Sequence, residues 1–366
     1  MTTVQALEVA AEPLDWLRQR VFRWLLAAPG LRWLLLSRDR RVGVHAVLGV
    51  LVALAMTAVF PAFLFVVGPL VLGVAHVASD LRYLVLRRSV PRGVVGMAAL
   101  FCGALFVLRG VELLGKRWLG ASHEMMLLEV WAGASVVAAG LAEGRRGRAA
   151  LGMAAVLGLG MAAQQRPELS RLIFAHGHNL IGVGLWLLLF RRRIGPVIPA
   201  LALLLLGLGL TVSGATLPLA AGAGGLSFAG QTLADVASWI VPMVPVRWMA
   251  GALLSYIFLQ AIHYSVWLAW VPQEDTRAEG TTSFRMSLRS LQQDLRWLLW
   301  PVVAVATLVP LAALVFGAPL TRDVYLSLAS FHGYLEVAML AYFLVAPGAL
   351  QRTGREAPAA PVGPCV

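Results

Sequence analysis

The stretch that decides the fold class is LIFAHGHNLIGVGLWLLLFRRR, residues 172–193, an apolar run as long as a membrane-spanning helix. Near the middle of this run stand two histidines and an asparagine, His176, His178 and Asn179. The run therefore predicts a spanning helix that carries imidazoles where the surrounding solvent is hydrocarbon. Polar groups at that depth cost free energy and usually mark a function, so this helix contributes to a candidate functional site.

The rest of the chain has the same membrane character. Of its 366 residues, 59% are hydrophobic and only 13% are charged, and the mean hydropathy is +0.79. This composition predicts an all-α, polytopic membrane helical bundle. The formal net charge of +12 comes almost entirely from arginine. Because the arginines cluster at the ends of apolar runs, we interpret them as topology signals and contacts with anionic membrane lipid, and we expect no nucleic-acid partner.

Windows of about 20 apolar residues predict about ten transmembrane helices. Their ranges are 43–60, 63–86, 93–114, 123–143, 147–164, 168–190, 195–218, 247–271, 297–317 and 322–347. Most of the arginines flank these segments on one side, if both termini are cytoplasmic. This bias predicts a protein of a bacterial-type inner membrane with the N-terminus in and the C-terminus in.

The organisation outside the spanning segments is also predictable. We expect a cytoplasmic N-terminal amphipathic segment at 1–42, a transmembrane bundle at 43–347 and a disordered cytoplasmic tail at 348–366. Within the first part, 13–37 alternates arginine with Trp, Leu and Phe at helical spacing, which predicts an interfacial helix on the membrane surface. The Gly-rich stretch 219–246 predicts an outer loop with a short re-entrant or interfacial helix. Residues 273–296 form a charged loop in this interpretation.

Four of the predicted segments place histidines inside the membrane. His76 and Asp80 are four residues apart and so share one face of a helix, as do His332 and Glu336. The third segment, 168–190, carries His176 and His178, and the fourth, 247–271, carries His263. All four segments have even numbers and run in the same direction, and their histidines differ in depth by about one helical turn. The spacing thus predicts one buried layer of facing imidazoles.

A divalent metal ion would offset the cost of such a layer, because neutral imidazoles and carboxylates can ligate it or orient one another. The predicted metal ligands are His76, Asp80, His176, His178, His263, His332 and Glu336. Positions i and i+2 point about 200° apart on a straight helix, so His176 and His178 can both ligate only if Gly177 loosens the helix. Of the two, we favour His176. Histidine and carboxylate without thiolate suit iron, copper, manganese or zinc.

Further side chains are weaker candidates. The tyrosines near the layer could deliver protons or electrons, although helix packing is at least as good an explanation for each; they are Tyr83, Tyr256, Tyr264 and Tyr334. We expect an interfacial structural role for His45 and a helix cap or solvated charge for Asp235. His123 lies at a loop boundary. Glu129 lies inside the segment 123–143, and the sequence leaves open whether it faces the site.

Four short motifs resemble the Brp/Blh-like family of integral membrane β-carotene 15,15'-dioxygenases. They are GVAHVASDLRYL with His76 and Asp80, FAHGH with His176 and Gly177, AIHYSVW with His263, and SFHGYLE with His332. Ala75 and Val77 replace the proline and glycine of that family's first motif. The resemblance implies a multi-helical membrane protein that binds non-haem iron through histidines and uses dioxygen to cleave a carotenoid.

Three functions remain open on the sequence. The first is a metal-dependent membrane oxidoreductase, with one or two non-haem iron ions, that uses dioxygen on an apolar lipid or isoprenoid small molecule. The second is a b-type haem protein for electron or quinol transfer, since histidines on different helices can be axial ligands. The third is a proton- or metal-coupled transporter, in which the layer is a relay or transit site.

Overall fold

The computed structural model describes residues 9, 11–88, 90–115, 120–190, 193–241, 244–274 and 283–351. These residues are almost entirely helical, which confirms the predicted all-α fold. Among them, nine helices are long and apolar enough to cross a membrane, consistent with an integral membrane protein. The fifth predicted segment, 147–164, is also a helix, but it is not among these nine, because two arginines and two glutamines at its ends make it less apolar.

The chain divides into two compact units. Unit 1 comprises Met1–Ser79 and Leu172–Ser327, and unit 2 comprises Asp80–Arg171 and Leu328–Val366. The predicted single bundle is therefore built from two separate clusters of helices. Helix α5 (Pro61–Asp80) continues directly into the π-helical η1 (Leu81–Leu86), so one continuous helix runs from the first unit into the second.

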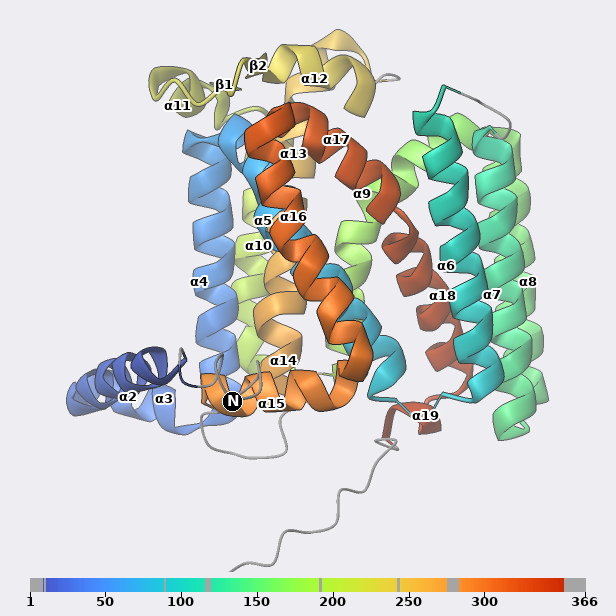
Figure 1. The fold of residues 1–366 in the computed structure, drawn as a ribbon, viewed down its shortest axis with the longest axis horizontal. Coiled ribbons are helices and arrows are strands. Elements are labelled where there is room, and N and C mark those ends of the chain that lie inside the picture. The colour runs from blue at the N-terminus through green and yellow to red at the C-terminus, as the bar shows by residue number, and fades with distance from the viewer. Residues whose placement is uncertain are drawn as a thin grey trace, which may run out of the picture. The chain divides into compact units, whose positions relative to one another are not determined.

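Unit 1 contains most of the spanning helices (Figure 1). Besides α5 these are α4 (Arg38–Val59), α9 with η2 (Pro167–Leu185, Trp186–Phe190), η3 with α10 (Gly195–Val197, Ile198–Val212), α13 with η4 and α14 (Val246–Ser265, Val266–Trp270, Val271–Glu274), and α16 (Leu299–Phe316). The short α17 (Ala318–Ala329) also lies mainly in this unit and forms the first part of the candidate span Ala318–Val345. Helix α4 ends at Val59 and α5 begins at Pro61. Proline fits the first turn of a helix but cannot continue the preceding helix, so the boundary lies here.

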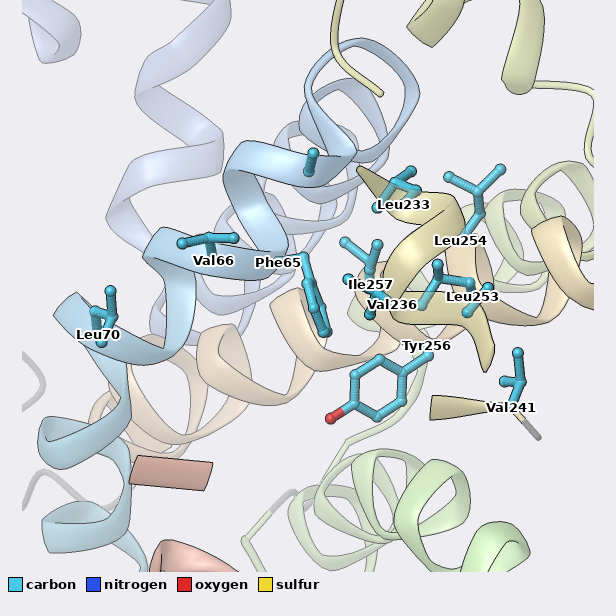
Figure 2. Close-up of a cluster of buried hydrophobic side chains, with 12 residues drawn as sticks. Phe65, Val66, Leu70, Leu233, Val236, Val241, Leu253, Leu254, Tyr256 and Ile257 are labelled. Carbon is cyan, nitrogen blue, oxygen red and sulfur yellow. The ribbon is translucent and has the colours of Figure 1, made fainter. Parts of the chain in front are cut away.

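The predicted outer loop is an ordered cap on unit 1. It contains α11 (Leu217–Gly222), a two-stranded antiparallel hairpin of β1 (Ser227–Phe228) and β2 (Gln231–Thr232), and α12 (Leu233–Ile240). Asp235 completes a capping box with Thr232, so its predicted role as a helix cap is confirmed. The apolar face of α12 packs with α5 and α13 into one buried cluster (Figure 2).

At the opposite end of unit 1, three amphipathic helices lie across the direction of α4 (Figure 1). The predicted interfacial helix at 13–37 is present as α2 (Glu12–Ala27) and α3 (Pro29–Leu36), with a break before Pro29. The predicted charged loop 273–296 is wrong in part, because it contains α15 (Phe284–Leu295), which η5 (Arg296–Leu298) joins to α16. Ser283 caps α15. Along this helix the half-buried Leu288 and Leu291 and the buried Leu295 follow helical spacing.

Unit 2 consists of η1, α6 (Arg92–Leu113), α7 (Ala121–Glu143), α8 (Arg146–Gln165), α18 (Phe331–Val345) and α19 (Gly348–Gln351). The predicted last segment is interrupted at Ser330, between α17 and α18. The short α19 occupies the first four residues of the predicted disordered tail, and the rest of that tail lies outside the described residues.

Candidate functional site: a histidine cluster in unit 1

Two of the predicted ligands meet inside unit 1, on neighbouring helices. His76 on α5 and His263 on α13 are 2% and 1% exposed, and their ring centroids are 5.3 Å apart in an edge-on arrangement. A ring nitrogen of each lies within 4.8 Å of the other. Two nitrogens bound to one metal ion at about 2.1 Å are at most about 4.2 Å apart, so a small inward movement would let them share an ion.

A third imidazole reaches this pair from α9. The ring of His178 lies 5.3 Å from that of His263, whereas the ring of His176 lies 5.0 Å from Tyr256, further along α13. The helix remains regular through Gly177, so the two side chains meet different partners. The order of preference is thus the reverse of the prediction, because the contact with the histidine pair comes from His178.

Backbone carbonyls fix the tautomers on α9. Nδ1 of His176 lies 3.0 Å from the carbonyl oxygen of Leu172, and Nδ1 of His178 lies 3.3 Å from that of Phe174. A carbonyl can only accept, so each Nδ1 carries the proton and donates it. Each neutral ring then keeps its lone pair on Nε2, which is the atom that could bind a metal.

Close helix packing makes room for the cluster. A Cβ atom at Gly182 on α9 would lie 2.8 Å from Nδ1 of His263, which is closer than real contacts allow. Only glycine therefore permits α9 and α13 to approach at this point. On the other side, the hydroxyl of Ser79 donates to the carbonyl oxygen of Trp267 at 2.6 Å and ties α5 to the end of α13.

Two of the predicted tyrosines line the cluster. The ring of Tyr264 lies 4.7 Å from that of His76 and 6.4 Å from that of His263. The ring of Tyr256 contacts His176 and also Phe65, which belongs to the apolar cluster beneath α12 (Figure 2). Both tyrosines are buried, and the hydroxyl of Tyr256 accepts a hydrogen bond from Gln260 at 3.5 Å. A phenol beside an imidazole can exchange a proton with a bound molecule.

Aromatic side chains close the cluster toward the end of α13. The two helices that carry His178 and His263 both end in π-helical turns, η2 and η4. Trp186 and Trp270 from these turns pack at 4.7 Å, and Trp267 is fully buried beside them. Single π-helical turns are rare and occur frequently at functional sites. Here they contribute three large rings that are fully buried.

Asp80, a predicted carboxylate ligand, is the last residue of α5 and the first residue of unit 2. It lies one helical turn after His76, so the two side chains share a face. Asp80 is fully buried, and neither of its carboxylate oxygens has a hydrogen-bond partner among the residues that the structure describes. A buried carboxylate in that condition is costly unless it is protonated or bound to a cation.

Unit 2 contains the remaining predicted ligands. A ring nitrogen of His332 lies within 4.8 Å of a carboxylate oxygen of Asp80. Nδ1 of His332 donates to the carbonyl oxygen of Ala329 at 2.6 Å, so its Nε2 keeps the lone pair. Glu336, one turn further on α18, is fully buried. Within this unit, Asp80 and His332 are therefore close enough to act on one ligand.

A buried ion pair in unit 2 was not predicted. Arg109 on α6 contacts Glu124 on α7 at 2.9 Å, and Tyr334 donates to the same carboxylate at 3.2 Å. Glu124 is only 1% exposed. The predicted site tyrosine Tyr334 is thus part of this ion-pair cluster, which holds α18 against α7. The adjacent Arg109 and Glu112 gave a signal in the sequence, since charges near the end of an apolar segment normally find a partner.

Other candidates have structural roles. The ring of Tyr83 lies under the guanidinium groups of Arg82 and Arg87. His123 accepts a hydrogen bond from the backbone of Gly120 at the start of α7, and the exposed His45 contacts Gln273. The carboxylate of Glu129 packs closely against Gly160 of α8. A Cβ atom added to Gly160 would lie 2.2 Å from the carboxylate carbon.

Comparisons with protein families, with characterised proteins and with solved structures found no match to this chain. The assignment of a function therefore depends on the chemistry of the side chains.

Proposed function

We propose that this chain is a membrane-bound, metal-dependent oxidoreductase that uses non-haem iron and dioxygen on an apolar lipid or isoprenoid. The observation that carries the proposal is the histidine cluster of unit 1. His76, His178 and His263 come from three helices and are next to one another in an apolar core. Apolar side chains would pack such a core at a lower cost in free energy than three imidazoles do, so the imidazoles indicate a function.

The side chains fit a non-haem iron ion. Neutral imidazole nitrogens are donors that non-haem ferrous iron accepts, and three of them meet in unit 1. The sequence-based prediction adds a carboxylate, Asp80, one turn after His76 on the same helix. The cluster contains no thiolate, which argues against a structural zinc site. The sequence-based prediction adds His176, His332 and Glu336 to the ligands. Copper, manganese and zinc remain possible occupants of the same donor set.

Bound ferrous iron would supply the activation of dioxygen. The chain's own residues would orient the ion, exclude water and exchange protons. Tyr264, beside His76, and Tyr256, beside His176, could each donate or accept a proton at the phenolic oxygen. Trp186, Trp267 and Trp270 shield the cluster from water, which protects reactive oxygen species from side reactions.

An apolar substrate agrees with the surroundings of α9. This helix carries His176 and His178, and its residues Ile173 and Leu180 are 61% and 39% exposed. In a bilayer that face would contact lipid, so a hydrophobic molecule could approach from the membrane without crossing water. The resemblance to β-carotene dioxygenases is in accord with this substrate class and with the proposed metal.

The proposal is tested by measuring bound metals in the purified protein by elemental mass spectrometry, with a visible spectrum of the same sample. We expect about one or two iron ions per chain and no Soret band. A Soret band would replace the proposal with the b-type haem protein. Absence of any stoichiometric metal, even after incubation with ferrous iron, copper, manganese and zinc in turn, would leave the proton-coupled transporter.

A further inference from the structure

The N-terminal helix α2 presents an apolar stripe that its own chain does not cover. Leu14, Leu17, Val21 and Trp24 are spaced i, i+3, i+7 and i+10, so they lie on one face. Their exposed fractions range from 47% to 75%. A surface helix of a globular protein would bury such a face, whereas an interfacial helix inserts it between lipid head groups.

The orientation of this stripe is fixed by a contact on the other side of α2. Asp15 is 1% exposed and accepts hydrogen bonds from the backbone N–H of Phe284 at 2.6 Å and of Arg285 at 3.4 Å. Its carboxylate thereby caps the N-terminus of α15, where the N–H groups have no partner within the helix. The side chain of Arg285 also donates to Asp15 at 3.2 Å. The contact holds α2 and α15 together; these two helices, with α3 that directly follows α2, are here called the platform.

The platform also carries uncompensated positive charge. Arg20, Arg23 and Arg32 are exposed, and within the described part of the chain none of them has an acidic partner. The guanidinium of Arg20 lies 4.8 Å above the ring of Trp16, which leaves its N–H groups turned to the surroundings. Arginine favours phosphate oxygens, because its planar group can donate two parallel hydrogen bonds.

We propose that the platform of α2, α3 and α15 is a binding surface for anionic phospholipids. The apolar stripe would enter the acyl region, and the three arginines would contact phosphodiester head groups. The charge and the exposed stripe occur on the same helix, which is the pattern of a lipid-binding interfacial helix. This inference is independent of the histidine cluster.

The test measures lipid binding to the full-length, detergent-purified protein by native mass spectrometry, with phosphatidylglycerol and phosphatidylcholine as probes. The protein should prefer phosphatidylglycerol, and the variant R20Q/R23Q/R32Q should lose that preference. Each arginine near an anionic surface contributes about fivefold in affinity, so we expect at least a tenfold weaker phosphatidylglycerol affinity. The matched control, R92Q/R146Q/R148Q, removes three exposed arginines from unit 2 and should retain the preference.

Three results would overturn the proposal. The first is an equal loss of phosphatidylglycerol affinity in both triple variants, and the second is no preference for phosphatidylglycerol in the unaltered protein. The third is a dimer that the variant L17Q/V21Q dissociates, which would assign the stripe to a second copy of the chain. Gel filtration and thermal unfolding of each variant report whether it has folded.

Discussion

Gly182 is a single residue on which the histidine cluster depends. Its missing side chain lets α9 lie against His263, since a Cβ atom would be 2.8 Å from the imidazole. We expect Gly182→Ala to displace that ring, to lower metal occupancy and to destabilise the fold by about 1–3 kcal/mol.

Gly184, two residues later on the same helix, is the matched control. A Cβ atom there would have no neighbour within 4 Å, so Gly184→Ala should retain metal and gain up to about 1 kcal/mol of helix stability. Metal content and thermal unfolding of both variants check the prediction. Equal metal occupancy in the two would show that the close approach at Gly182 does not matter.

Asp15 makes the docking of α2 dependent on pH. Burial by itself would raise the pKa of Asp15, but hydrogen bonds from Phe284 and Arg285 outweigh it, and the pKa is lowered. A carboxyl group with a lowered folded-state pKa stabilises the docked state above its unfolded pKa of about 3.9. That stabilisation is lost as the pH falls through the lowered pKa. The docked state should therefore persist at neutral pH and separate only in acid.

The distance between spin labels at Gln19 on α2 and Gln292 on α15 measures this docking. We expect a narrow distribution at pH 7, and a broad one in strong acid or in the variant Asp15→Asn. Glu12→Gln is the control, because Glu12 is 64% exposed and reaches Arg285 only at 3.9 Å. A narrow distribution in Asp15→Asn would contradict the role of this carboxylate.

The cap on unit 1, formed by α11, β1, β2 and α12, is stabilised at the N-terminus of α12. Thr232 and Asp235 form a capping box there, with hydrogen bonds of 2.7–3.2 Å between them. We expect Thr232→Val, which removes the hydroxyl but keeps the shape, to weaken α12 by about 1 kcal/mol. Hydrogen exchange across Leu233–Ile240 should then be about fivefold faster. Ser213→Ala is the control, since it removes an exposed hydroxyl in the same unit; the prediction fails if α12 exchanges equally in both.

The helices were predictable to different degrees. Spanning helices were predicted well, because 20 apolar residues have few alternatives to a helix in a bilayer. The break at Ser330 and the π-helical turns were not predicted, because they arise from tertiary packing and the local sequence shows no pattern that indicates them. Helix α15 was missed although its leucines have helical spacing, since its arginines and glutamines favour the interpretation as a loop.

The site was also predictable only in part. Spacing alone placed His76 on the face of Asp80 and at the depth of His263, and the contact of the two histidines confirms that depth. The preference for His176 over His178 had no firm basis in the sequence, because the ring that contacts His263 depends on the rotation of α9 against α13. Gly182 could not be identified either, since a glycine in a spanning helix is usually a general packing contact.

For the molecule as a whole, the arginine distribution predicts which side of the membrane each end of unit 1 faces. Helices α11 and α15 lie at opposite ends of the unit (Figure 1). Ala223, which directly follows α11, and Ser287 on α15 are both exposed. In intact cells, an impermeant thiol reagent should label Ala223→Cys and spare Ser287→Cys, in a background without Cys102 and Cys365. The reverse labelling would contradict the predicted cytoplasmic location of the N-terminus.

The central claim is that the histidine cluster of unit 1 holds a metal ion. The most direct measurement is the iron content per chain of His263→Gln beside that of His45→Gln, both loaded with ferrous iron under the same conditions. The first variant removes the imidazole that contacts both His76 and His178, and the second removes an exposed one. We expect iron to be lost from His263→Gln and retained by His45→Gln; undiminished iron in a folded His263→Gln protein would contradict the account.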